Sequence, residues 1–212
     1  MPTLNEQHQY FEGGAHVPGV TSILGEWIKA EWYGQIIYVH ARTGFALSEE
    51  RMKELSSIGT AIHKGVLFML TGQGLNWERL NPVLVAPLRQ GEKWIQENRP
   101  EVILAEKPLY SKKYNYAGTL DILCVTKNTK KGHYTLIDVK SGAYDMVSEQ
   151  LAAYEQLVRE NLGIRGLIDR YVLAMPRSGE PYRFIKVNKP KAFQYFLSKL
   201  FEYNYLQEAK CH

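Results

Sequence analysis

The sequence predicts one α/β domain with a mixed β-sheet flanked by helices. Two patterns support this class: three strand-like runs follow one another after residue 100, and a helix then alternates with two further strands before a final helix. The chain has 212 residues, 45% of them hydrophobic and 23% charged. This composition is ordinary for a globular protein and allows one sizeable core.

The first hundred residues are expected to form a helical N-terminal part. The stretch 17–44 opens with a turn and is expected to continue as an amphipathic helix with Thr21 or Ser22 as its N-cap. Two later stretches, 48–72 and 81–100, show helical patterns bounded by a serine, a glycine and a proline. The sequence therefore predicts three helices before the first long strand.

A three-strand antiparallel meander is expected next. Its runs are rich in apolar and β-branched residues, are joined by short turn-like segments, and cover 102–111, 116–127 and 133–142. The remaining elements are a helix, two more strands and a closing helix, expected at 146–163, 168–176, 182–187 and 189–209.

Charge and cysteine content limit the possible functions. The net charge of +4 is no argument for nucleic acid by itself. Residues 107–140 are locally basic, with seven lysines against two aspartates, and residues 183–212 carry six lysines and arginines against two glutamates. These segments allow binding of a polyanion. The two cysteines, Cys124 and Cys211, cannot build a disulfide framework or a four-thiolate metal site. No apolar run approaches membrane-spanning length, so we expect no membrane partner and a cytoplasmic protein.

The third expected strand carries an aspartate and a lysine two residues apart. Strand side chains alternate, so Asp138 and Lys140 point to one face while Ile137 and Val139 point to the other. An isolated pair of this kind is usually a surface ion pair. However, antiparallel pairing can place Asp121, on the preceding strand, beside Asp138. Two adjacent carboxylates repel, and a divalent cation removes that conflict because it binds carboxylate oxygens.

Four further residues lie on the neighbouring elements. Glu106, on the first strand of the meander, could supply another carboxylate or form a surface pair with a lysine. His63 faces the apolar side of its helix, where a lone histidine is usually a core residue. Gln150 and Tyr154 are four residues apart and share one face of the helix after the third strand.

Taken in order, these motifs resemble the RecB-type exonuclease family of the PD-(D/E)XK nuclease superfamily. The resemblance rests on a helical G-x-x-x-H, a G-x-x-D strand, a D-x-K strand and a Q-x-x-x-Y helix, at 59–63, 118–121, 138–140 and 150–154. The literal proline before the aspartate is absent, since Leu120 occupies that position. The N-terminal stretch VPGVTSIL looks like the lead-in of stand-alone phage and mitochondrial members. Two cysteines are too few for the iron–sulfur cluster of other relatives.

The resemblance implies a restriction-endonuclease-like core in one nuclease domain, residues 1–212. Its parts would be a helical N-terminal part, a catalytic sheet with the Q-x-x-x-Y helix, and a C-terminal helix, at 1–100, 101–188 and 189–212. The implied activity is a divalent-metal-dependent deoxyribonuclease, an exonuclease acting on single-stranded DNA or DNA ends in recombination, repair or replication. The implied location is a bacterial or phage-infected cell. A structure- or sequence-specific endonuclease and a non-catalytic nucleic-acid-binding module are the alternatives.

The resemblance also implies the roles of individual residues. Mg²⁺ or Mn²⁺ would be bound by a set of four residues, His63, Asp121, Asp138 and Val139, the last through its carbonyl. The implied catalytic residues are Asp121, Asp138, Lys140, Glu106, Gln150 and Tyr154. Lys140 would orient the attacking water or stabilise charge on the phosphate, and a depressed pKa would let it act as a base.

DNA contacts are expected from basic loops and from aromatic side chains. The candidates for backbone contact are Lys112, Lys113, Lys130 and Lys131, together with Gln150 and Tyr154. Trp27, Trp32 and Tyr33 are candidates for stacking on unpaired bases, although aromatic residues at such spacing are more often core. Besides DNA, a recombination protein or a single-strand-binding protein is a candidate partner.

Overall fold

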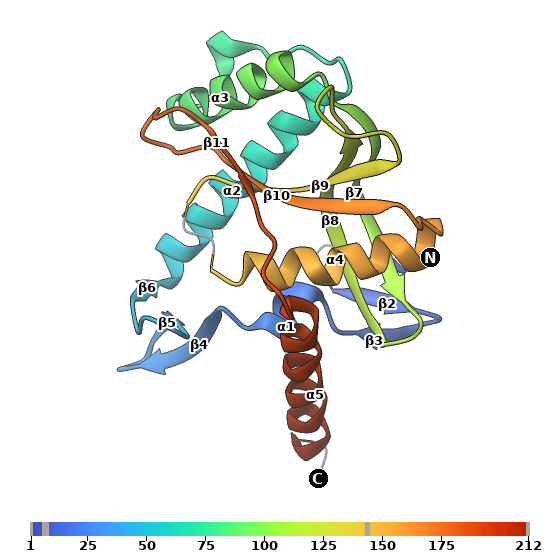
Figure 1. The fold of residues 1–212 in the computed structure, drawn as a ribbon. Helices are drawn as coiled ribbons and strands as arrows, with labels where there is room; N and C mark the ends of the chain where they lie inside the picture. Colours follow the sequence, from blue (N-terminus) through green and yellow to red (C-terminus); the bar gives the residue numbers. More distant parts are fainter. Residues whose placement is uncertain (1, 6–8, 143–144, 211–212) are drawn as a thin grey trace.

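A five-stranded mixed sheet forms the centre of the computed structural model, which describes residues 2–5, 9–142 and 145–210 (Figure 1). The order of its strands is β11 (Arg183–Lys186), β10 (Leu167–Ala174), β9 (His133–Lys140), β8 (Tyr116–Val125) and β7 (Glu101–Ser111). The three-strand meander β7–β8–β9 is antiparallel, as the sequence predicts. Helix α4 (Val147–Leu162) connects β9 to β10, which pair in parallel, and β11 returns antiparallel to β10.

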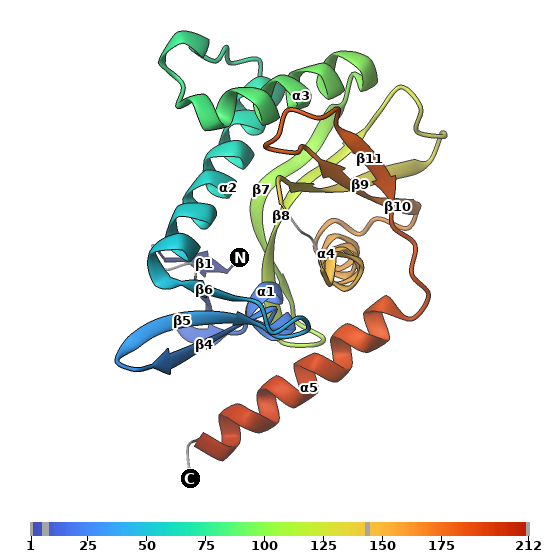
Figure 2. The ribbon, with the colours of Figure 1, turned by 90° about the vertical axis from the view of Figure 1, so that its left-hand side faces the viewer.

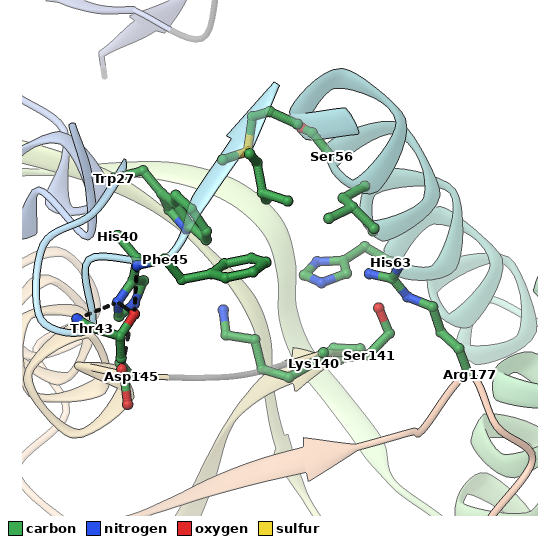
Figure 3. Close-up of a pocket in the computed structure, with 16 residues that line it drawn as sticks. Trp27, His40, Thr43, Phe45, Ser56, His63, Lys140, Ser141, Asp145 and Arg177 are labelled. Atoms are coloured by element: carbon green, nitrogen blue, oxygen red, sulfur yellow. Dashed lines mark hydrogen bonds and ion pairs between the residues drawn. The ribbon is translucent and has the colours of Figure 1, made fainter. Parts of the chain in front are cut away.

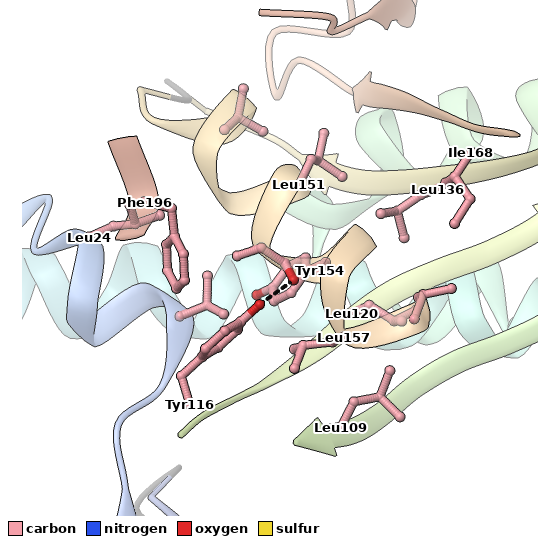
Figure 4. Close-up of a cluster of buried hydrophobic side chains, with 14 of the residues drawn as sticks. Leu24, Leu109, Tyr116, Leu120, Leu136, Leu151, Tyr154, Leu157, Ile168 and Phe196 are labelled. Carbon is pink, nitrogen blue, oxygen red and sulfur yellow. Dashed lines mark hydrogen bonds between the residues drawn. The ribbon is translucent and has the colours of Figure 1, made fainter. Parts of the chain in front are cut away.

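Helices cover both faces of this sheet (Figure 2). Helices α2 (Glu49–Leu70) and α3 (Pro82–Asn98) pack on one face, where they bury apolar residues against Ile137 and Val139. Helix α4, the short α1 (Val20–Leu24) and α5 (Ala192–Lys210) pack on the other face. Figure 4 shows this second cluster, in which Tyr116 donates a hydrogen bond to the Ala153 carbonyl at 2.9 Å. The two clusters hold the sheet in a fixed position between the helices.

The predicted helical N-terminal part is wrong for residues 3–48. Its described residues, 3–5 and 9–48, contain one five-residue helix, α1, and six short strands in two antiparallel sheets. The strands are β1 (Thr3–Leu4), β2 (Tyr10–Glu12), β3 (Ala15–Val17), β4 (Trp27–Trp32), β5 (Gln35–His40) and β6 (Ala46–Ser48). The N-cap of α1 is Gly19, not Thr21 or Ser22.

The physical reason for this difference lies in two turns. Gly25 adopts φ 57° and ends α1 in a left-handed cap. Tyr33 and Gly34 both have positive φ, 48° and 74°, which is the geometry of a tight hairpin between two strands. On the two sides of the second turn, aromatic and β-branched residues pair as strands β4 and β5 instead of continuing a helix.

The later helices agree with the sequence pattern. The hydroxyl of Ser48 accepts a hydrogen bond from the Arg51 N–H at 3.2 Å and caps α2. The segment between α2 and α3 contains a short 3₁₀ helix, η1 (Trp77–Arg79). Cys124 is a free, buried cysteine on β8, and Cys211 lies outside the described residues. Among the residues with a described structure, no helix is both long and apolar enough to cross a membrane.

Candidate metal centre

Three side chains from three different elements converge beside the sheet. His63 comes from α2, Glu106 from β7 and Asp121 from β8, and one ligand atom of each lies within 4.8 Å of the others. The His63 Nδ1 atom lies 3.4 Å from Asp121 Oδ1 and 3.8 Å from Glu106 Oε1. An imidazole with two carboxylates is a donor set that divalent cations accept.

A local change in the strands turns the two carboxylates toward His63. On β8, Leu120 and Leu123 are three residues apart, yet both pack in the cluster under α4, so the alternation of side chains breaks between them. Directly across the β7–β8 ladder, Glu106 has φ 47°, a left-handed conformation that is rare for a glutamate. Such backbone strain is typical of functional sites.

The side chain of Asp121 takes the place of a backbone hydrogen-bond acceptor between β8 and β9. Pairing between β8 and β9 ends at Ile122 and Ile137, one position before Asp121 and Asp138. Beyond that point Asp121 Oδ2 accepts a hydrogen bond from the Val139 N–H at 2.7 Å. The two strands separate here, and the carboxylate occupies the gap between them.

Asp138 and Lys140 share a face of β9, as strand alternation predicts. Asp138 is 1% exposed, and its Oδ2 lies 2.9 Å from Lys140 Nζ. Neither carboxylate oxygen of Asp138 has a partner in hydrogen-bond geometry among the described residues. Burial raises the pKa of Asp138 to about 6, Lys140 opposes this, and the charge of Asp121 adds to it. A buried carboxylate of this kind has unused capacity to bind a cation.

Lys140 is held in its charged form. Burial alone would lower its pKa, but the carboxylates of Asp138 and Asp121 outweigh that effect and raise it. Without a bound metal the pKa of Lys140 is thus raised and not depressed, and its action as a base stays a prediction.

Helix α4 holds the lysine through two side chains one turn apart. Lys140 Nζ donates to Gln150 Oε1 at 3.4 Å, and Gln150 Nε2 donates to the Tyr154 hydroxyl at 3.1 Å. Both Gln150 and Tyr154 are buried, and their contact with DNA stays a prediction. The Tyr154 ring packs on Gly118, where a Cβ atom would lie only 2.7 Å from Tyr154 Cε1.

The electrostatics of His63 and Asp121 are mutually dependent. Burial lowers the pKa of His63, but the charge of Asp121 and hydrogen bonds to Asp121 and Glu106 raise it to about 10. Burial would raise the pKa of Asp121, whereas His63, Lys140 and the Val139 N–H lower it. Positive charge at the position of the imidazole is therefore favourable, which fits a site for a cation.

The predicted lysine contacts do not gather around this centre. Lys112 and Lys113 lie in the turn between β7 and β8, while Lys130 and Lys131 lie in the turn between β8 and β9. These turns stand at opposite ends of the ten-residue strand β8, roughly 30 Å apart at 3.3 Å per residue. Two different surfaces would have to contact DNA if all four lysines do so.

Glu26 and Arg177 lie near the site although no sequence motif marks them. Burial raises the pKa of Glu26 to about 7, Lys140 opposes this, and Asp145 and Asp138 add to it, so this glutamate belongs to the same charge network. Glu26 lay in a segment expected to be helical, and Arg177 follows β10 with no motif around it. A pocket of about 840 Å³ lies between α2, the small sheet β4–β6 and the ends of β9 and β10 (Figure 3).

Comparison with known proteins leaves the family open. No protein-family model and no curated protein matches the chain. Among solved structures, a crystal structure described as a "putative exonuclease" from Eubacterium rectale aligns with a TM-score of 0.32 and 14% identity. The alignment covers 53% of this chain and 49% of that one, so the chain spans about half of the matched protein. A likeness of this degree assigns neither family nor activity.

Proposed function

We propose that this protein is a divalent-metal-dependent DNA exonuclease of the RecB type that hydrolyses phosphodiester bonds in single strands or at DNA ends. The observation that carries the proposal is the convergence of His63, Glu106 and Asp121 beside the buried Asp138–Lys140 pair. Carboxylates, an imidazole and a charged lysine gathered where β8 and β9 separate are the groups that metal-assisted phosphoryl hydrolysis needs.

The donor set fits a hard divalent cation, Mg²⁺ or Mn²⁺. His63, Glu106 and Asp121 would hold it, and the buried carboxylate of Asp138, which lies 2.9 Å from Lys140 Nζ, is proposed as a further ligand. The Val139 N–H already bonds to Asp121, and a role for the Val139 carbonyl as a ligand is part of the proposal. A bound cation would offset charge on the scissile phosphate and lower the pKa of a coordinated water.

The chain's own residues would orient the reacting groups. The Val139 N–H fixes the orientation of the Asp121 carboxylate. Gln150 and Tyr154 fix the Lys140 ammonium, which would donate hydrogen bonds to a phosphate oxygen and stabilise its developing negative charge. Water is the proposed nucleophile, so no covalent protein intermediate is expected.

End-labelled single-stranded DNA tests this proposal. Oligonucleotides labelled at the 5′ or the 3′ end would be incubated with Mg²⁺, Mn²⁺ or EDTA and with wild type, Lys140→Ala or the control Lys93→Ala, whose exposed lysine lies on α3. We expect metal-dependent loss of label with wild type and Lys93→Ala but not with Lys140→Ala. The label lost first gives the polarity. Absence of cleavage by wild type in both metals would contradict the proposal.

Circular single-stranded DNA separates the exonuclease from the endonuclease alternative. An exonuclease needs an end and leaves the circle intact, whereas an endonuclease opens it. Binding of DNA without cleavage of either substrate would favour the non-catalytic binding module.

A further inference from the structure

The pocket beside the candidate metal centre has two walls of different chemistry. One wall is apolar and partly aromatic, formed by Trp27, Phe45, Leu47, Met52 and Leu55. The other wall carries basic groups, formed by His63, Lys140 and Arg177. Figure 3 shows the side chains of Phe45, His63 and Lys140 pointing into the same space.

Charge in the pocket favours an anionic ligand. Among its described lining residues Asp145 is the one acid, and it already pairs with His40 and Arg42 at 3.4 and 3.5 Å. Arg177 contributes an unused donor, because its Nε atom is buried and has no hydrogen-bond partner among the described residues. A phosphate group accepts hydrogen bonds from guanidinium and ammonium groups, and Arg177 and Lys140 both line this pocket.

The apolar wall is fixed before any ligand binds. Trp27 packs edge-to-face on His40, with ring centroids 5.1 Å apart. Two backbone hydrogen bonds close the loop that carries Phe45, from the His40 N–H to the Phe45 carbonyl at 2.8 Å and from the Gly44 N–H to the His40 carbonyl at 2.9 Å. Phe45 is nevertheless 60% exposed, so its ring offers a flat surface to a ligand at little ordering cost.

We propose that this pocket seats one unpaired nucleobase of the DNA strand, stacked on the ring of Phe45, while the adjacent phosphate lies at Lys140 and Arg177. The inference rests on the proposed function and specifies its substrate as a single strand. A flat aromatic base with an anionic phosphate on one side matches an aromatic wall that faces a cationic one. The volume of about 840 Å³ lies in the usual range for small-molecule sites. A base must leave the duplex stack to enter such a concave site.

Binding without cleavage tests the pocket separately from the nuclease activity. Fluorescence anisotropy in EDTA would compare three labelled probes: a short oligothymidylate, an oligomer of equal length and charge made wholly of abasic residues, and a blunt hairpin duplex. The proteins would be wild type, Phe45→Ala, Phe45→Trp, Arg177→Ala and the control Phe201→Ala. Phe201 is an exposed phenylalanine on α5, outside the pocket, so this control removes the same ring elsewhere.

The expected result depends on the bases. Phe45→Ala should weaken binding of oligothymidylate by about 5- to 150-fold, the range measured for loss of one base–aromatic stack. It should leave the abasic oligomer and the duplex within about twofold of wild type, and Phe45→Trp should retain binding. Arg177→Ala should weaken the oligothymidylate and the abasic oligomer alike, because a phosphate contact does not read the base.

Two outcomes would overturn the inference. One is a wild type that binds oligothymidylate no more tightly than the abasic oligomer, and the other is a Phe45→Ala variant that binds oligothymidylate like wild type. Thermal unfolding of Phe45→Ala next to Phe201→Ala checks the fold. Base-dependent binding without metal-dependent cleavage would support the base-binding pocket and contradict the nuclease proposal. Metal-dependent cleavage with binding and cleavage both unaffected by Phe45→Ala would support the nuclease proposal and contradict the base-binding pocket.

Discussion

The carboxylate of Asp121 accepts a hydrogen bond from the backbone N–H of Val139 at 2.7 Å. This bond stands where the β8–β9 ladder has already ended, since the last paired residues are Ile122 and Ile137. One oxygen of Asp121 closes the gap between the strands while the other lies 3.4 Å from His63. Asp121 thus combines a structural role with an electrostatic one, and two substitutions can separate them.

Asp121→Asn and Asp121→Ala should both abolish metal-dependent cleavage, because both remove the ligand charge. Their stabilities should differ. The asparagine carbonyl can still accept from the Val139 N–H, whereas alanine leaves that buried donor without a partner, at a cost of about 1–3 kcal/mol. Urea unfolding in EDTA measures the difference. Equal stabilities would show that the hydrogen bond to Val139 contributes little.

Replacing the glycine of the G-x-x-D motif and that of the G-x-x-x-H motif with alanine should change the stability of the fold in opposite directions. At Gly118 a Cβ atom would lie 2.7 Å from Tyr154 Cε1 and 2.9 Å from Val20 Cγ2, so Gly118→Ala should destabilise the fold by about 1–3 kcal/mol. At Gly59, inside α2, no atom lies within 4 Å of the added Cβ, so Gly59→Ala should stabilise by about 0.5–1 kcal/mol. Thermal unfolding of the two variants compares them directly, and a shift of the same sign for both would contradict the packing around Gly118.

Tyr154→Phe should impair catalysis through Lys140. The substitution keeps the ring and removes the hydroxyl that accepts from Gln150, which in turn holds Lys140. We expect kcat to fall by about 10- to 100-fold with KM nearly unchanged, because the effect is a loss of orientation. In a Gln150→Ala background Tyr154→Phe should cause no further loss, since the Tyr154 hydroxyl acts on Lys140 through Gln150. Additive losses in the double variant would exclude this pathway.

The sheet and its charged pair followed directly from sequence periodicity. The strands of the meander alternate or run apolar between turn residues, and the face shared by Asp138 and Lys140 is a consequence of that alternation. Sequence periodicity did not predict the strands between Gly25 and Ser48 correctly. There, aromatic and β-branched residues are compatible with either a helix face or a half-buried strand. The positive φ values of Tyr33 and Gly34 produce the hairpin turn.

The geometry of the site depended on contacts that periodicity does not encode. The break in alternation at Asp121 and the left-handed backbone of Glu106 arise only when β7, β8 and α2 meet. Strict alternation therefore predicted the Asp121–Asp138 neighbourhood but not the His63–Glu106–Asp121 cluster. Glu26 lies near Lys140 because the segment that follows it is the strand β4. The helix predicted for that segment could not predict this proximity.

Mn²⁺ should support at least as much cleavage as Mg²⁺. The reason is the imidazole of His63 in the candidate ligand set, since nitrogen ligands suit Mn²⁺ better than Mg²⁺. His63→Gln, which replaces the ring nitrogen with an amide, should reduce the Mn²⁺-dependent rate more than the Mg²⁺-dependent rate. Parallel titrations of both metals measure this. Strong activity in Mg²⁺ with almost none in Mn²⁺ would argue against His63 as a ligand.

Glu26 should make the metal-free fold less stable as the pH rises. Its pKa is raised from 4.5 to about 7 in the folded protein, because burial disfavours the carboxylate. Below pH 4.5 the group is protonated in both the folded and the unfolded chain and has no effect. Between pH 4.5 and about 7 the unfolded chain releases its proton first, so unfolding becomes progressively easier, and above that range the cost is complete.

Glu26→Gln removes this titration and keeps the shape of the side chain. The full shift corresponds to about 3 kcal/mol, and partial solvent exposure reduces the expected effect to about 1–2 kcal/mol. In EDTA, the free energy of unfolding of Glu26→Gln relative to wild type should therefore rise by that amount between pH 4 and pH 8. Glu31→Gln, which alters an exposed glutamate on β4, the strand that directly follows Glu26, is the matched control for loss of one charge. A difference between Glu26→Gln and wild type that does not change with pH would mean that Glu26 is not held in a buried, carboxylate-disfavouring environment beside Lys140.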